Sequence, residues 1–77
     1  MIPRALQRLI TDALTNGWTV GARHHGTSLF ATFTSPDMVL VEFQWHDGRI
    51  VTASIDDEPT PYTQCTRLLR TNPEEQQ

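Results

Sequence analysis

Apolar and polar residues alternate in four short segments between Trp18 and Ile55, and turn-forming residues separate these segments. Such alternation is typical of β-strands that bury one face and expose the other. Two of the turns contain Pro36–Asp37 and Asp47–Gly48, which are residue types that favour chain reversal. Because the turns are short, consecutive strands pair with each other, and the pattern predicts a four-stranded antiparallel meander.

The register of each hairpin follows from the requirement that apolar residues share a face. A two-residue turn at His25–Gly26 satisfies this requirement in the first hairpin. In the second, a turn of Asp47–Gly48 alone would place Phe43 opposite Thr52, so we expect a three-residue loop, His46–Asp47–Gly48, with a left-handed glycine. The expected pairs are Ala22–Leu29, Val20–Ala31, Trp18–Phe33, Phe43–Val51, Val41–Ala53 and Val39–Ile55.

Two helices flank the predicted strands. The first is expected over residues 3–15, with Pro3 in its first turn and Asn16–Gly17 at its end. Its apolar positions recur every 3.6 residues and are Ile2, Leu6, Leu9, Ile10, Ala13 and Leu14. The second is expected to be capped by Thr60 and to end at Asn72–Pro73. The predicted fold class is α+β, in the order α-β-β-β-β-α, with both helices packed on one face of the sheet.

The chain has 77 residues, enough for one small domain, which we assign to residues 1–73 with a flexible acidic tail at 74–77. Its single cysteine, Cys65, excludes an intrachain disulfide and is expected to be a structural thiol. No signal peptide or membrane span is evident, so we expect a cytoplasmic protein. Small cores are often supplemented by oligomerisation, which makes a homodimer a natural alternative to a monomer.

The face of the sheet away from the helices is rich in threonine and carries a few apolar residues. Either it is solvated or it is the interface of a homodimer. The residues expected at such a dimer interface are Phe30, Leu40 and Ile50.

All six basic residues are arginines, and the net charge is −3. The predicted topology carries the arginines and histidines to one end of the sheet, while most acidic residues lie at the other. Arginine forks suit carboxylate and phosphate groups, so this end is expected to contact an anionic partner. The contacts are assigned to Arg4, Arg23, Arg49, Arg67, Arg70 and His46.

Catalytic and metal sites are not favoured by the spacing. His24 and His25 lie one strand away from His46, a separation of about 10 Å, which is too wide to require a shared metal ion. The acidic triplet Asp56–Asp57–Glu58 is expected at the opposite end, beyond reach of any histidine. We therefore expect no metal, no cofactor and no enzymatic activity.

The segment 16–37, which includes Gly26-Thr27-Ser28, resembles the beginning of the HicA toxins, which are small ribonuclease-like proteins with a double-stranded-RNA-binding fold. At the position of the family's catalytic histidine this chain has Ser28, so the resemblance implies a non-catalytic relative. Three hypotheses result. The first is a small binding or adaptor module of bacterial or phage type, which docks on a protein and can form a homodimer. The alternative is a nucleic-acid-binding protein that uses the arginines. The third is a metal-dependent enzyme centred on the histidines.

Overall fold

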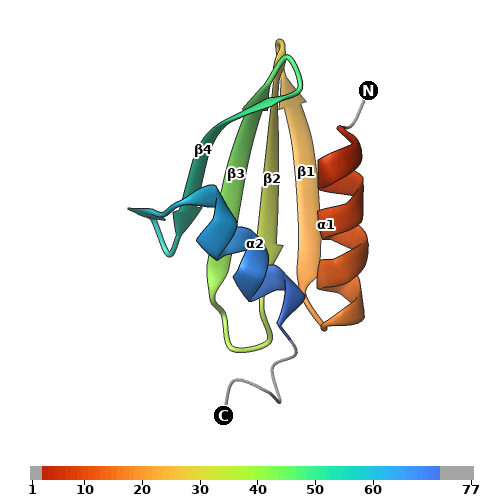
Figure 1. The fold of residues 1–77 in the computed structure, drawn as a ribbon, viewed down its shortest axis with the longest axis vertical. Coiled ribbons are helices and arrows are strands. Elements are labelled where there is room, and N and C mark those ends of the chain that lie inside the picture. The colour runs from red at the N-terminus through yellow and green to blue at the C-terminus, as the bar shows by residue number, and fades with distance from the viewer. Residues whose placement is uncertain (1–2, 72–77) are drawn as a thin grey trace.

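The computed structural model describes residues 3–71 and contains two helices and five antiparallel strands. The elements are α1 (Arg4–Thr15), β1 (Thr19–His25), β2 (Ser28–Thr34), β3 (Leu40–His46), β4 (Arg49–Ile55), β5 (Glu58–Pro59) and α2 (Tyr62–Arg70). The strands are ordered β1-β2-β3-β4-β5 in a single sheet, so the predicted α+β class and antiparallel meander are confirmed (Figure 1). No helix within residues 3–71 has the length and hydropathy needed to cross a bilayer.

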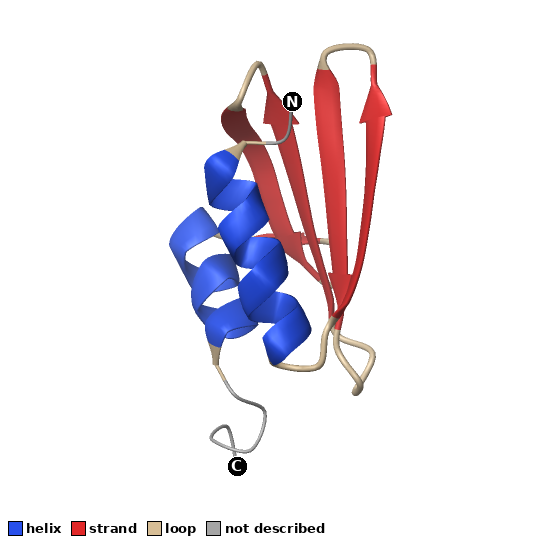
Figure 2. Cartoon of the chain, turned by 90° about the vertical axis from the view of Figure 1, so that its right-hand side faces the viewer, coloured by secondary structure: helices blue, strands red, loops and turns tan. Residues whose placement is uncertain are grey.

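Both helices lie on the same side of the sheet, and the other side carries no helix (Figure 2). One cluster of buried side chains joins the helices to the covered side of the strands. Its members are Leu6, Leu9, Ala13, Trp18, Leu29, Ala31, Phe33, Val41, Phe43, Trp45, Cys65 and Leu69. Alternate residues of β2 and β3 are buried, which is the two-residue period seen in the sequence.

The register of the first hairpin differs from the prediction by two residues. Gly26–Thr27 form the two-residue loop, and Ala22 pairs with Ala31 and Val20 with Phe33. Gly26 has φ +64° and is the only loop residue with positive φ, which matches a type II′ turn with glycine in its first position. Because the shift is even, each side chain stays on its expected face.

The second hairpin has a shorter loop than predicted, and a bulge restores the pattern. Asp47 (φ 51°) and Gly48 (φ 78°) form the turn alone, with the two positive φ angles of a type I′ turn. The register then shifts between Gln44 and Trp45, which leaves Val51 as an extra residue in β4. Because of this bulge Phe43 pairs with Ala53, whereas the uninterrupted two-residue register would place Thr52 there.

The strand count was underestimated because the segment after β4 does not simply leave the sheet. Asp56 (φ 50°) and Asp57 (φ 68°) form another tight turn, and Glu58–Pro59 pair with the end of β4. The Asp56 side chain also accepts a hydrogen bond from the Leu40 amide at 2.9 Å. This segment was predicted as a break and instead forms a further hairpin with β4.

The second helix does not begin as predicted, and it does not run back towards the hairpin tips, where its arginines were expected. It starts at Tyr62 without a side-chain cap, and the Thr60 hydroxyl donates to the Glu58 carbonyl at 2.8 Å instead. Its last turn lies beside the second half of α1, where Asn16 Nδ2 donates to the Leu69 carbonyl at 3.0 Å. The helix therefore runs towards the lower end of the sheet in Figure 1. Ile2, Asn72–Pro73 and the tail 74–77 lie outside the described residues.

Candidate functional site

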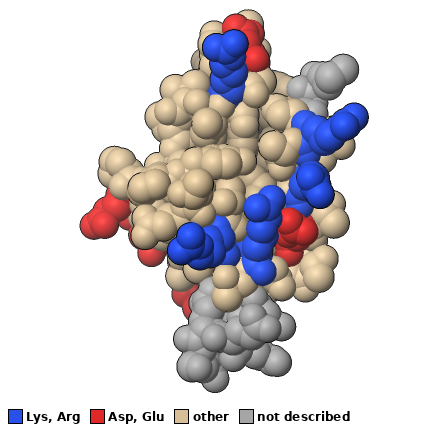
Figure 3. Space-filling model, in the orientation of Figure 1, with Lys and Arg blue, Asp and Glu red and all other residues tan. Residues whose placement is uncertain are grey.

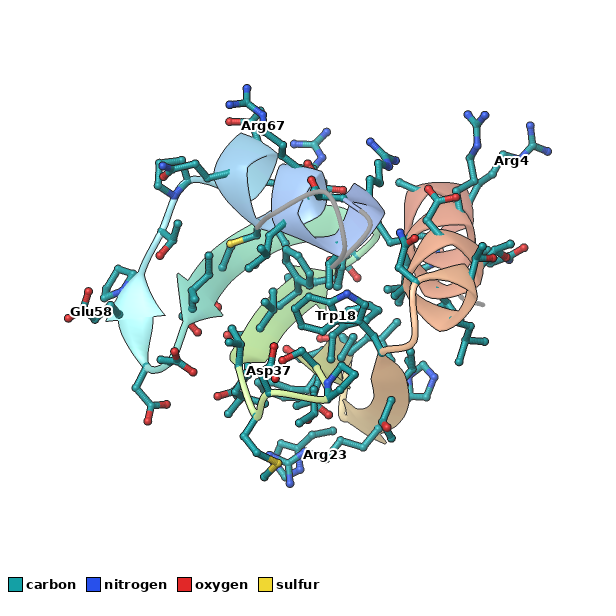
Figure 4. All side chains as sticks on the ribbon, turned by 90° about the horizontal axis from the view of Figure 1, so that it is seen from below. Arg4, Trp18, Arg23, Asp37, Glu58 and Arg67 are labelled. Atoms are coloured by element: carbon teal, nitrogen blue, oxygen red, sulfur yellow. The ribbon has the colours of Figure 1, made fainter. Side chains whose placement is uncertain are left out.

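The six arginines do not gather at one end of the sheet, so that prediction is wrong. Arg4 and Arg67 project from the helical layer, whereas Arg23 projects from the opposite side of the molecule (Figure 4). The physical reason is the direction of α2, which carries Arg67 and Arg70 downwards beside α1. The anion-contact residues expected from the sequence are consequently divided between two surfaces.

The first surface consists of the exposed arginines of the two helices, and we call it the helical arginine surface. Its members are Arg4, Arg8, Arg67 and Arg70. Basic side chains are spread over both helices in Figure 3. Asp12 is the one acidic residue of α1, and α2 has none; Arg70 Nε donates to Asp12 Oδ2 at 3.0 Å. Both side chains are about half exposed, so this ion pair orients Arg70 more than it stabilises the fold.

Arg8 was not among the arginines assigned to anion contacts. Arg4 and Arg8 are four residues apart in α1, and residues at that spacing lie on the same face of a helix. This spacing could have identified Arg8 from the sequence alone.

Two shallow grooves adjoin the helical arginine surface. One, of about 290 Å³, runs along α1 and is lined by Arg4, Gln7, Arg8, Thr11 and Asp12. The other, of about 350 Å³, lies where α2 passes β4, and it is lined by Ile55, Thr60, Gln64, Arg67, Leu68 and Thr71. The second groove thus combines apolar side chains with a guanidinium group.

The second surface is the upper part of the sheet side that carries no helix. Cross-strand partners project from the same face, so the register defines two rungs of side chains there. The end rung consists of His25, Ser28, His46 and Arg49, and the next rung contains Arg23, Phe30 and Gln44. We call these seven residues the upper sheet face.

Several contacts link the residues of the upper sheet face. The Arg23 guanidinium lies over the Phe30 ring, 5.3 Å from its centroid. Gln44 Nε2 donates to Ser28 Oγ at 3.4 Å. His46 Nδ1 lies 3.1 Å from Thr27 Oγ1, and His46 Nε2 lies 3.4 Å from Asp47 Oδ2. The His46–Thr27 contact connects the tips of two hairpins, whereas the His46–Asp47 contact lies within one of them.

Hydroxyl, imidazole and carboxylate groups therefore meet at these tips, as they do in nucleophilic active sites. The geometry is loose, however: Ser28 Oγ is 3.5 Å from His46 Nδ1, at the limit of a hydrogen bond. The side chains of His46 and Asp47 are 50% and 74% exposed, so water competes for every contact. The arrangement orients the imidazole of His46.

A metal site would need the three histidines to lie close together. Within residues 3–71, no group of three histidine, cysteine, aspartate or glutamate side chains is placed to hold a metal ion. His24 pairs with Leu29 and belongs to the helix side of the sheet, whereas His25 and His46 lie on the other side.

The expected dimer residues do not share one surface. Phe30 and Leu40 are half-buried on the side without helices. Ile50 pairs with Trp45, whose side chain belongs to the core on the helix-covered side. Ile50 therefore also faces the helix-covered side. The bulge at Val51 causes this difference, because it changes the alternation of β4 between Ile50 and Thr52.

Burial also affects two ionisable groups in the core. It raises the pKa of the Tyr62 hydroxyl, an effect that the nearby Arg70 guanidinium partly opposes. It raises the pKa of the Cys65 thiol as well, against a smaller opposing effect of a backbone hydrogen bond. Tyr62 lies with its ring 5.5 Å from that of Phe43, and Cys65 is fully buried. Both groups are therefore held in their neutral forms.

These shifts predict a loss of stability in alkaline solution. A pKa that is higher in the folded state means that the folded chain keeps protons that the unfolded chain has lost. The free energy of unfolding should be unaffected near pH 7, well below the ordinary cysteine pKa of about 8.5, and should fall as the pH rises through 10. Urea titrations between pH 7 and 11 measure this decline, and Tyr62→Phe should make it shallower. A stability that stays constant to pH 11 would contradict the prediction.

No family model, curated protein or solved structure matches the chain.

Proposed function

We propose that this protein is a small non-enzymatic binding module that docks on an acidic partner protein through the helical arginine surface. The observation that carries the proposal is the separation of charge within residues 3–71. The two helices hold four arginines and one aspartate, a net charge of +3. The remaining described residues hold two arginines and six carboxylates, a net charge of −4. A chain whose overall charge is negative thus presents one basic layer.

The neighbouring grooves support a protein as the partner. The groove beside α2 offers Ile55 and Leu68 next to Arg67, which suits a partner segment with an apolar residue flanked by carboxylates. Guanidinium groups bind carboxylates through paired hydrogen bonds, and complementary charge accelerates association. The absence of any disulfide is compatible with action in the cytoplasm, where we place this function.

Charge reversal tests the proposal. The full chain would be immobilised and used to capture proteins from an extract of its source cells, alongside the double variant Arg8→Glu/Arg67→Glu. Neither arginine has an ion pair among the described residues, so the variant should fold normally. We expect a protein that the unaltered chain captures to be missing from the material captured by the variant. The affinity of the variant for that protein should be at least tenfold lower, since close charge pairs couple by about 1.5 kcal/mol or more.

A matched variant provides the control. Arg23→Glu/Arg49→Glu makes the same change of net charge on the opposite surface and should retain the partner. Equal loss from both variants would show that net charge alone matters, and retention by the Arg8/Arg67 variant would place docking elsewhere. If the captured material that depends on Arg8 and Arg67 is nucleic acid, the proposed acidic protein partner is wrong.

Self-association is a separate part of the proposal. Two copies would repel each other through the helical arginine surface, so a homodimer would have to use another part of the molecule. Sedimentation equilibrium at micromolar concentration decides this point, and a monomer would remove the homodimer from the proposal.

A further inference from the structure

We propose that the upper sheet face is a second binding site, which takes single-stranded nucleic acid. This inference does not rest on the docking function, because it concerns the opposite side of the molecule and different residues. It starts from the position of Phe30, a half-buried aromatic ring on a sheet side that carries no helix. An aromatic ring on an open sheet can stack with an unpaired base, whatever the identity of that base.

The groups around Phe30 are those that such a ligand needs. Arg23 lies over the ring, and its guanidinium plane can stack with a base or bind a phosphate. A hollow of about 260 Å³ is lined by Arg23, His24, His25 and Phe30. Gln44 pairs with Phe30 across the strands and offers an amide for a base edge.

The end rung supplies contacts for the sugar–phosphate backbone. It crosses β1 to β4, a width of about 14 Å at the usual strand spacing. His25, His46 and Arg49 are exposed along it, with Ser28 between the histidines. All four are hydrogen-bond donors, and Arg49 carries a permanent positive charge.

Acidic groups mark the limits of this surface. Asp47 lies in the turn beyond the end rung and contacts His46 Nε2 at 3.4 Å. Glu42 lies one rung below Phe30, opposite Thr32. The backbone of the ligand should therefore cross the two upper rungs and avoid the lower half of the sheet, which leaves room for only a few nucleotides.

Single strands are favoured over duplexes because stacking on Phe30 needs a base that is free of its partner. A second copy of this chain is a poorer occupant, since face-to-face contact would bring Arg23 and Arg49 of both copies together. Like charges in such a contact are unfavourable.

Fluorescence anisotropy of a fluorescein-labelled ten-nucleotide uridine-rich RNA tests the proposal. At about 50 mM salt, where phosphate contacts are strong, we expect saturable binding that weakens as salt rises. Phe30→Leu keeps an apolar residue on the sheet but removes the stacking surface, and should weaken binding about tenfold. Arg23→Gln and Arg49→Gln should each lower the slope of log affinity against log salt by about 0.7.

Arg67→Gln is the matched control, because it removes the same charge from the other side and should leave the affinity unchanged. Circular dichroism establishes that Phe30→Leu is folded. Absence of binding at 50 mM salt, an equal loss from Arg67→Gln, or equally strong competition by a duplex of the same sequence would each overturn the proposal. So would a dimer in sedimentation that dissociates on Phe30→Leu.

Discussion

Phe43→Ala is expected to lower the free energy of unfolding by about 3–5 kcal/mol, the usual cost of truncating a buried phenylalanine. Phe43 is only 2% exposed, and it connects both layers of the fold. Its ring centroid lies 5.6 Å from that of Phe33, 5.2 Å from Trp45 and 5.5 Å from Tyr62. Truncation removes three aromatic contacts at once and leaves a cavity that these rings cannot fill without moving.

The measurement is urea unfolding followed by far-ultraviolet circular dichroism. Typical domains have a free energy of unfolding of about 5–15 kcal/mol, and a chain of this size is expected near the lower limit, so the variant should be largely unfolded at 37 °C. Phe43→Leu is the control, because it keeps most of the buried volume and should cost far less. A loss below about 1 kcal/mol for Phe43→Ala would show that the ring is not packed as described.

Gly48→Val is expected to cost about 2–3 kcal/mol, because β-branched residues are strongly disfavoured at positive φ. Gly48 has φ 78° in the turn between β3 and β4. A Cβ at this position would meet no atom within 4 Å, so the cost comes from the backbone conformation and not from a collision. Restoring a negative φ would destroy the type I′ turn and would displace the bulge that aligns Phe43 with Ala53.

Gly48→Asn separates these effects, since asparagine tolerates the left-handed conformation and should cost under about 1 kcal/mol. Both variants can be compared by thermal unfolding. If Val and Asn destabilise equally, the positive φ of Gly48 is not what the turn requires. The valine variant should also lose the contact between His46 and Thr27. Its affinity for RNA is a second measurement of the structure at this end of the sheet.

The predicted hairpins show where alternation is informative and where it is not. A period of two residues assigns a side chain to a face, and an even error in register leaves that assignment intact. The shift of two residues at Gly26–Thr27 therefore changed the pairs without changing the core. In the second hairpin, an Asp-Gly turn and a bulge at Val51 pair Phe43 with Ala53 and Val41 with Ile55, and not with the predicted partners Val51 and Ala53.

The candidate binding residues were harder to predict than the strands. Arg23, His46 and Arg49 lie on β1, β3 and β4, and the alternation of each strand places them on one side of the sheet, which the local pattern could indicate. Arg67 and Arg70 could not be placed in the same way. Their position depends on the direction of α2, which is set by contacts between residues far apart in the chain, such as Asn16 with Leu69.

By itself the sequence determined the α+β class, the antiparallel meander and most of the core, because turn residues and alternation act between neighbours in the chain. Only the tertiary structure decided the fifth strand, the bulge and the direction of α2, and with them the division of the arginines between two surfaces. The physical reason is that charged side chains are tolerated almost anywhere in solvent. Their grouping is therefore fixed by how buried apolar surfaces pack, and not by any pattern among the charges.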